Sequence, residues 1–253
     1  MSISSELLYG QSWLSLLNQD LQKIKNDSLY QEIENEAGAP RIDIEGSPFL
    51  ASCDFNERSI ALDPLLFESK TGNAFPKALQ FYLFELANLS QAKEFKSLID
   101  RVDHLTPDKF VEEYEQLEHQ SALKAKEILR RCLPKQEWSQ YSMTRVPENF
   151  ETHYLVQQLS GHSQEIWERY ADLFPPNSFY YGTWNSVAED EKPILFALID
   201  FKSRMEDKDP VISAQGKEKY SLVKDRASRQ NESLRSRLMP KIQLIESVSS
   251  RAN

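Results

Sequence analysis

The spacing of apolar residues changes only once along this chain, between residues 41 and 64. Residues 41–46 alternate polar and apolar side chains, as a β-strand does. A second short strand is expected at 49–55, and residues 56–58 form a turn before a third at 59–64. Elsewhere apolar residues recur mainly at steps of three and four, the spacing of helices. We therefore expect a predominantly α-helical α+β fold with one small β meander or hairpin.

The composition supports a helical globular protein. The 253 residues include only 7 glycines against 12 prolines, which disfavours a β-sandwich or barrel with many tight turns. Hydrophobic residues make up 40% of the chain, enough to build a core. No stretch approaches the roughly 18 apolar residues of a membrane-spanning helix.

Helical periodicity and breaker residues divide the rest of the chain. A break is expected near 26–28 in the first segment, near Gly161 in the fourth, and near Pro240 in the last. We expect a globular domain at 1–205 and a polar, mildly basic helical arm or tail at 206–253. From residue 201 onward there are 12 Lys and Arg against 7 Asp and Glu. The expected helices span 5–36, 77–98, 106–131, 147–170, 192–205 and 214–248.

Part of the chain resembles a known enzyme family. Residues 59–63 read Ser-Ile-Ala-Leu-Asp and are followed by a helix that carries Phe84-Glu85-Leu86-Ala87-Asn88. This order resembles the core of zincin-type metallopeptidases, especially compact versions found in bacterial toxins and effectors, over about residues 40–130. In that family, an Ile-x-Leu-Asp strand precedes a helix with the motif HExxH. A later helix supplies a third, acidic ligand, for which Glu115 and Glu118 are the nearest matches.

The departures from the zincin motif remove its chemistry. HExxH binds zinc through two histidines one helical turn apart, with the glutamate between them as general base. Phe84 and Asn88 occupy the histidine positions here, and only Glu85 matches. We therefore expect the protein to bind no zinc stoichiometrically and to carry no metal or cofactor. Glu85 and Asn88 are interpreted either as the polar side of an amphipathic core helix or as a polar site with a new task.

A second candidate group lies on the expected helix 106–131. Glu115 and His119 are four residues apart and share a face with Glu118, a geometry that can hold a metal. One such pair offers too few ligands, so we interpret it as a solvent-exposed face that binds a partner. His104, His153 and His162 have no neighbours at a diagnostic spacing, and we interpret each as structural.

Nucleophilic catalysis receives little support from the sequence. Cys53 and Cys132 lack metal-ligand or redox spacing, so we expect two reduced, partly buried thiols. Arg130 and Arg131 would lower the pKa of the Cys132 thiol, although the end of a helix opposes that effect.

An aromatic segment lies between the fourth and fifth expected helices. Residues 174–184 contain Phe179, Tyr180, Tyr181 and Trp184, together with two prolines and a glycine. Such a segment suits a rigid surface for binding another protein. The alternative is that its rings fold back over the core.

These observations lead to two functional hypotheses. The first is a catalytically degenerate zincin-like protein, of the bacterial effector or toxin-related class, that acts by binding another protein. The second is a metal-independent hydrolase or transferase on the same scaffold, with Glu85 as general base and Asn88 positioning the substrate. The net charge of -9 disfavours general nucleic-acid binding. Residues 1–6 lack a basic n-region, so we expect a cytoplasmic protein, or one delivered by a secretion system without a Sec signal peptide.

Overall fold

The computed structural model describes residues 5–44, 50–67, 78–182 and 187–248. Contacts group the chain into two compact units. Unit 1 comprises residues 1–97 and 120–144, and unit 2 comprises residues 98–119 and 145–253. This grouping differs from the expected segments 1–205 and 206–253. The predominantly helical α+β fold class is confirmed.

Unit 1 begins with helices α1 (Ser5–Leu21) and α2 (Ser28–Ala37). The expected break between them is confirmed, because the Asp27 carboxylate accepts hydrogen bonds from the backbone N–H groups of Leu29 and Tyr30 and so starts α2. Gly38, at φ 76°, ends α2 in the left-handed conformation that glycine adopts readily. The chain then turns directly into the first strand.

The three expected strands are confirmed. The second and third form an antiparallel hairpin, one of the two expected arrangements, whereas a meander of all three is wrong because the first strand pairs in parallel with the third. β1 (Arg41–Ile44), β2 (Ala51–Asp54) and β3 (Ser59–Leu62) form one sheet in the order β1-β3-β2. β3 pairs in parallel with β1 and antiparallel with β2. The side chains of Ile60 and Leu62 are fully buried, which suits β3 to the central position. Alternation of residues within each strand carries no information on this order.

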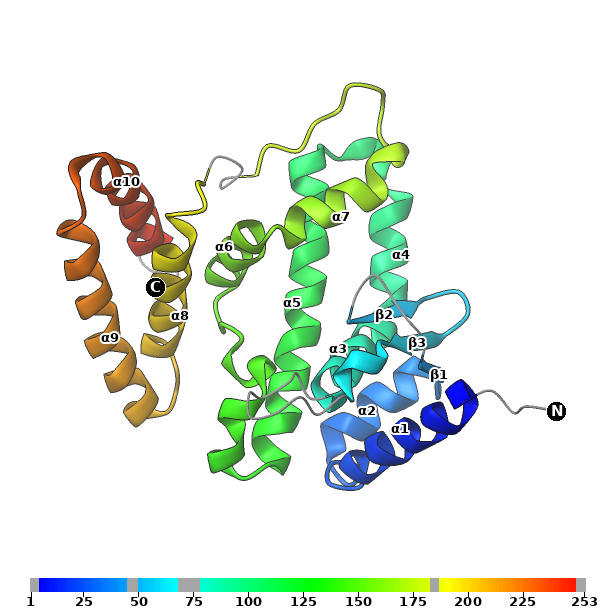
Figure 1. Cartoon of the computed structure of the whole chain (residues 1–253). Helices are drawn as coiled ribbons and strands as arrows, with labels where there is room; N and C mark the ends of the chain where they lie inside the picture. Colours follow the sequence, from blue (N-terminus) through cyan, green and yellow to red (C-terminus); the bar gives the residue numbers. More distant parts are fainter. Residues whose placement is uncertain (1–4, 45–49, 68–77, 183–186, 249–253) are drawn as a thin grey trace. The chain divides into compact units, whose positions relative to one another are not determined.

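Helix α3 (Ala78–Ser90) packs against α2, β2 and β3 (Figure 1). The expected helix 77–98 is divided at Gln91, whose side-chain amide donates a hydrogen bond of 2.6 Å to Ser121 Oγ. Helix α4 (Ala92–Asp100) follows at once. The core of unit 1 also receives residues 120–132 of helix α5 (Pro107–Cys132) and the short 3₁₀ segments η1 (Pro64–Leu66) and η3 (Lys135–Gln140).

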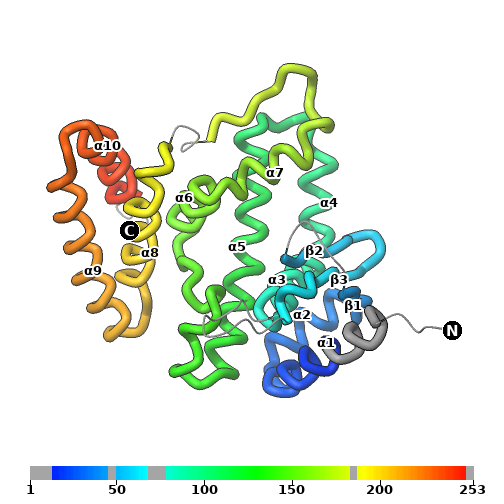
Figure 2. Tube along the Cα trace, viewed as in Figure 1, coloured from blue at the N-terminus to red at the C-terminus, as the bar shows by residue number. Residues whose placement is uncertain are grey.

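Unit 2 contains the first half of α5, followed after η4 (Ser142–Arg145) by α6 (Phe150–Ser160) and α7 (His162–Tyr170). The expected start of α5 is confirmed, with Thr106 Oγ1 accepting a hydrogen bond of 3.3 Å from the Lys109 N–H. The expected break near Gly161 is also confirmed, and Figure 2 follows the chain from α6 straight into α7. Short 3₁₀ turns η2 (Val102–His104) and η5 (Ala171–Leu173) precede α5 and follow α7.

The last three helices of unit 2 lie side by side (Figure 1). They are α8 (Lys192–Met205), α9 (Pro210–Ser228) and α10 (Glu232–Val248). Gly216 permits the close approach of α9 to the end of α8, because a Cβ there would lie 2.7 Å from the Met205 backbone nitrogen. Residues expected in a polar arm thus belong to a second apolar core. Its buried members are Leu155, Leu159, Leu195, Leu198, Ile199, Tyr220, Ala227, Leu238, Ile242 and Ile245.

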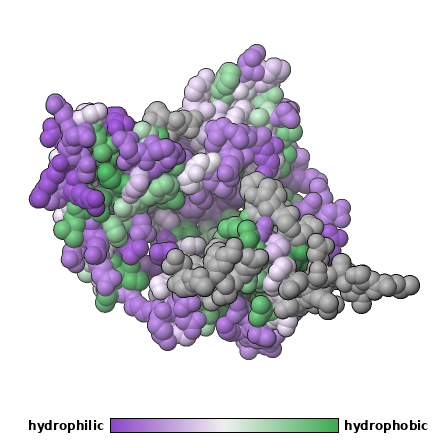
Figure 3. Space-filling view, in the orientation of Figure 1, coloured by the Kyte–Doolittle hydropathy of each residue, from purple (hydrophilic) through white to green (hydrophobic). Residues whose placement is uncertain are grey.

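The visible surface is mostly hydrophilic, with smaller hydrophobic areas between (Figure 3). Within the residues that the structure describes, no helix combines the length and apolar character needed to cross a membrane.

Candidate functional site

The acidic and histidine side chains on the first half of α5 are buried. Glu115 is fully buried, and Glu118 and His119 expose only 7% and 4% of their surface. The interpretation of this group as a solvent-exposed face is therefore wrong. Buried carboxylates require polar partners, and the starts of α6 and α7 supply them within unit 2.

The carboxylate of Glu115 lies at the centre of this group. Ser163 Oγ donates a hydrogen bond of 2.6 Å to its Oε1 atom, and His162 Nδ1 lies 3.1 Å from the same oxygen. Its other oxygen, Oε2, is buried without a hydrogen bond and faces His153 Nε2 at 3.9 Å. One oxygen of this buried carboxylate is thus satisfied, and the other points at an imidazole beyond hydrogen-bonding distance.

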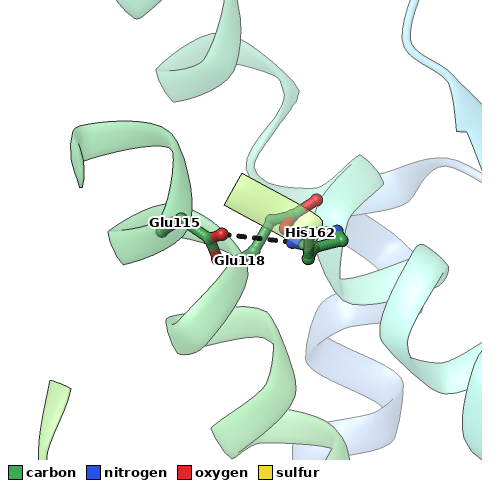
Figure 4. A group of neighbouring side chains, drawn as sticks. All are labelled: Glu115, Glu118 and His162. Carbon is green, nitrogen blue, oxygen red and sulfur yellow. Dashed lines mark hydrogen bonds and ion pairs between the residues drawn. The ribbon is translucent and has the colours of Figure 1, made fainter. Parts of the chain in front are cut away.

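His162 connects the two carboxylates (Figure 4). Its Nε2 atom lies 3.5 Å from Glu118 Oε2, while Nδ1 faces Glu115. Burial by itself would lower the pKa of His162, but the charges of Glu118 and Glu115 and the hydrogen bond to Glu115 outweigh it and raise the pKa to about 9. His162 is therefore a cation at neutral pH, with 35% of its side chain exposed.

His153 has the opposite electrostatic state. Burial, and to a lesser degree the neighbouring His119 and His162, lowers its pKa to about 3, so the imidazole is neutral at pH 7. The rings of His153 and His119 stack with centroids 4.5 Å apart and planes inclined by 27°. His119 Nε2–H in turn donates a hydrogen bond of 2.7 Å to the Pro147 carbonyl oxygen.

Local sequence signals place these histidines. Asn149 caps α6 by accepting a hydrogen bond from the Thr152 N–H, which sets His153 in the first turn of that helix. Gly161, at φ 93°, ends α6 and is immediately followed by α7. His162 and Ser163 therefore occupy the first turn of α7, where the helix N-terminus favours nearby carboxylates.

Among the described residues, Glu115, Glu118 and His162 form a group able to hold a metal ion, with one ligand atom from each lying within 4.8 Å of the others. Sequence spacing identified the two glutamates and His119. The interpretation of His153 and His162 as isolated structural residues missed their place beside Glu115. They come from two further helices, so only the Gly161 break between α6 and α7 hinted that they lie together.

The aromatic segment divides into buried and exposed rings. Phe174 and Tyr180 are buried, whereas Phe179 and Tyr181 expose 58% and 75% of their surface. The Tyr180 hydroxyl lies 3.5 Å from that of Tyr154 on α6. Trp184 lies outside the described residues. Phe174 and Tyr180 thus pack against the core, as one of the two interpretations expected. Phe179 and Tyr181 lie on the surface, as the other expected.

Contacts with α5 and α7 hold the aromatic segment that carries the exposed rings. The Tyr181 backbone N–H donates a hydrogen bond of 3.0 Å to the Asp108 carboxylate at the start of α5. The buried ring of Phe174 meets Phe110 and Trp167 edge-on or tilted, with centroids 5.5 and 5.1 Å away. The segment is therefore joined to α5 and α7 at both ends of its described part.

Glu85 and Asn88 lie in unit 1, on the middle of α3. Both are buried, and the Asn88 side-chain amide donates a hydrogen bond of 3.3 Å to Glu85 Oε2. Asn88 Oδ1 is buried without a hydrogen bond. Most residues of α3 are buried, including Glu85 and Asn88, so these two side chains do not form an exposed polar face of the helix.

Both cysteines are partly buried, and neither forms a disulfide within the part of the chain that the structure describes. The suggestion that Arg130 and Arg131 lower the pKa of Cys132 is wrong. Burial is the largest effect and, with Asp27 adding to it, raises that pKa, while Arg131 opposes only in part.

Comparison with known proteins adds no relative to this description. No family model, curated protein or solved structure matches the chain.

Proposed function

We propose that this protein acts by binding another protein through the exposed aromatic residues Phe179 and Tyr181. The observation that carries this proposal is their exposure on a segment that is otherwise anchored. Large rings left in water lose the free energy of burial, about 25 cal/mol per Å² of apolar surface. A partner that covers them recovers it. Aromatic side chains also dominate the energetically important positions of protein interfaces.

The anchored backbone supports this proposal further. Binding costs less when the contacting side chains are already held in place, because less conformational entropy is lost. Asp108 holds the Tyr181 backbone, and the buried Tyr180 lies between the two exposed rings in the sequence. Asp172, exposed just before this segment, adds negative charge. The partner surface that fits is an apolar pocket bordered by lysine or arginine.

The degenerate zincin-like core belongs to the same proposal. The order of β2, turn, β3 and α3 supports it, as do the non-ligating residues Phe84 and Asn88 where the zincin motif has histidine. On this proposal α3 is a structural helix, and the protein is a non-catalytic module of the bacterial effector or toxin-related class. On this proposal unit 1 has a structural role, and unit 2 carries the residues that bind the partner.

The alternative is a metal-independent hydrolase or transferase that uses Glu85 as general base. Its support is the buried carboxylate of Glu85 with the Asn88 amide 3.3 Å away, an arrangement that can hold a base in place. Glu85→Gln keeps the shape of the side chain and removes the base. Loss of a cellular effect in this variant, with partner binding unchanged, would favour the alternative.

A photo-crosslinking experiment tests the binding proposal. A benzophenone amino acid is placed at position 181 of the full chain, and at Leu222, an exposed residue of α9 in the same unit, as control. We expect position 181 alone to crosslink a distinct protein. The affinity of that purified protein is then measured for the wild type, for Phe179→Ser/Tyr181→Ser and for Leu222→Ser.

The expected result is a Kd weakened by about tenfold or more in the double variant, since each hot-spot residue contributes about 1 kcal/mol or more. Leu222→Ser should bind as the wild type does, and both variants should keep the wild-type melting temperature. Equal affinity of the double variant and the wild type would overturn the proposal. So would crosslinking only to a second copy of the chain.

A further inference from the structure

We propose that Glu115, Glu118 and His162, with His153 as a fourth ligand, form a binding site for one divalent transition-metal ion, Zn²⁺ above all. The site lies wholly within unit 2, between the first half of α5 and the first turns of α6 and α7. This inference stands apart from the proposed protein-binding function and does not depend on it.

Glu115, Glu118 and His162 offer carboxylate oxygens and imidazole nitrogens that lie close together. One atom each of Glu115, Glu118 and His162 lies within 4.8 Å of the other two (Figure 4). Zinc binds carboxylate oxygen and imidazole nitrogen at about 2.0–2.2 Å in tetrahedral geometry, which places two ligand atoms on one ion about 3.3–3.6 Å apart. The ligand atoms that lie furthest apart therefore need to approach by up to about 1.5 Å on binding zinc, which rotations of the glutamate and histidine side chains provide.

A buried histidine on α6, His153, faces the same group of side chains. His153 is 95% buried, and its Nε2 atom has no hydrogen-bond partner among the residues that the structure describes. This nitrogen faces Glu115 Oε2, which is also buried without a hydrogen bond, at 3.9 Å. Two buried polar atoms that face one another beyond hydrogen-bonding distance are costly. An ion between them would satisfy both.

The donor set also selects the ion. Mixed imidazole and carboxylate ligands suit first-row transition ions such as Zn²⁺, whereas Ca²⁺ and Mg²⁺ take oxygen ligands almost exclusively. Surrounding residues hold the ligands in place. Ser163 donates to Glu115 Oε1, and His119 stacks on His153 while its Nε2–H is fixed by the Pro147 carbonyl. His162 is protonated in the metal-free protein, so it must release its proton to solvent, to which 35% of its side chain is exposed, when its ring nitrogen binds the ion.

The inference differs from the zincin expectation in place and in ligands. Zinc in a zincin would lie on α3, where Phe84 and Asn88 offer no adequate ligands. Glu85→Gln should consequently leave zinc binding unchanged. The proposed ion is held by α5, α6 and α7, so loss of zinc in Glu85→Gln would count against this location.

The test uses the full chain, stripped of metal by a chelator and titrated with Zn²⁺ in calorimetry. We expect one ion per chain. Glu118→Gln and His162→Gln should each weaken binding by roughly tenfold or more. His104→Gln, a change at an exposed histidine of the same unit, should have no effect. Absence of stoichiometric zinc, or equal affinity in all variants, would overturn the proposal.

A second measurement needs no variant and covers the case of a variant that fails to fold. Long-range ¹H–¹⁵N NMR of the wild type observes histidine ring nitrogens directly. Added Zn²⁺ should shift one ring nitrogen each of His153 and His162 and leave those of His104 unchanged. Zinc that moves neither resonance lies elsewhere, for example at Cys53 or Cys132, and refutes the site.

Discussion

Ser163 donates a hydrogen bond of 2.6 Å to the Glu115 carboxylate from 48 residues further along the chain. Both residues are fully buried, and this contact joins the first turn of α7 to the middle of α5. It fixes one oxygen of Glu115 and so decides which oxygen faces His153.

Ser163→Ala should therefore destabilise the protein. Removing the hydroxyl leaves a buried carboxylate oxygen with one partner fewer, which costs about 1–3 kcal/mol. The free energy of unfolding from urea denaturation measures it. Ser236→Ala is the matched control, because Ser236 is exposed on α10 of the same unit and its hydroxyl donates a hydrogen bond to the Ser233 carbonyl. Equal losses in the two variants would show that the contact with Glu115 contributes nothing.

The stability of the metal-free protein should pass through a maximum near pH 6.5. The pKa of His162 is raised to about 9, so its contribution is complete below about 6.5 and is lost as the pH rises through 9. The pKa of His153 is lowered to about 3, so its contribution is complete above about 6.5 and is lost as the pH falls towards 3. Titration of His162 therefore lowers the stability on the alkaline side of the maximum, and titration of His153 lowers it on the acidic side.

Each histidine contributes a slope of at most about 1.4 kcal/mol per pH unit within its window. The slope from His162 should be smaller, because solvent screens its partly exposed side chain. Urea denaturation across the pH range measures both. His162→Gln should flatten the alkaline side alone, and His153→Gln the acidic side alone. A variant that flattens the other side contradicts the assignment.

Gly161→Ala should destabilise unit 2 through the backbone alone. At φ 93° a Cβ is strained, although no atom lies within 4 Å of it. The expected cost is about 1–2 kcal/mol. Gly161→Asn should cost less, since asparagine tolerates the left-handed region better than alanine does. The melting temperatures of the wild type, Gly161→Ala and Gly161→Asn measure these costs. A Gly161→Ala variant as stable as the wild type would exclude backbone strain at this position.

Several helices, and the breaks near 26–28 and Gly161, could be predicted because their signals are local, whereas the break expected near Pro240 is wrong, since α10 continues through that residue. Asp27 and Gly38 bound α2 by capping, and Gly161 separates α6 from α7 in the same way. The sheet order could not be predicted, since the position of β3 between β1 and β2 depends on burial against other elements. Gln91 was missed as a helix break, because its contact with Ser121 is distant in the sequence.

The candidate site was only half predictable. Glu115 and His119 share a helical face, which spacing reveals. Whether that face of α5 is buried depends on the packing of α6 and α7 against it. The spacing of apolar residues within α5 does not predict that packing. His153 and His162 lie on separate short helices, so no spacing within one helix links them to Glu115. The same holds for the aromatic segment, where burial of Tyr180 between exposed neighbours follows from its contact with Tyr154.

Ile245→Ala tests whether residues 206–248 are part of the unit 2 core. Ile245 is fully buried on α10 within the cluster that includes Leu198 of α8, so its truncation should cost about 2–5 kcal/mol. Leu244→Ala, at the adjacent and exposed position, should change stability by about 0.5 kcal/mol or less. Hydrogen exchange of the α8 amides supplies the measurement, because α8 should lose protection only if α10 supports it. An Ile245→Ala variant with unchanged protection of α8 would instead favour the polar arm that the sequence composition suggested. Loss of protection in α8 would show that the apolar positions of α10, sparse as they are, suffice to hold the last helices of unit 2 together.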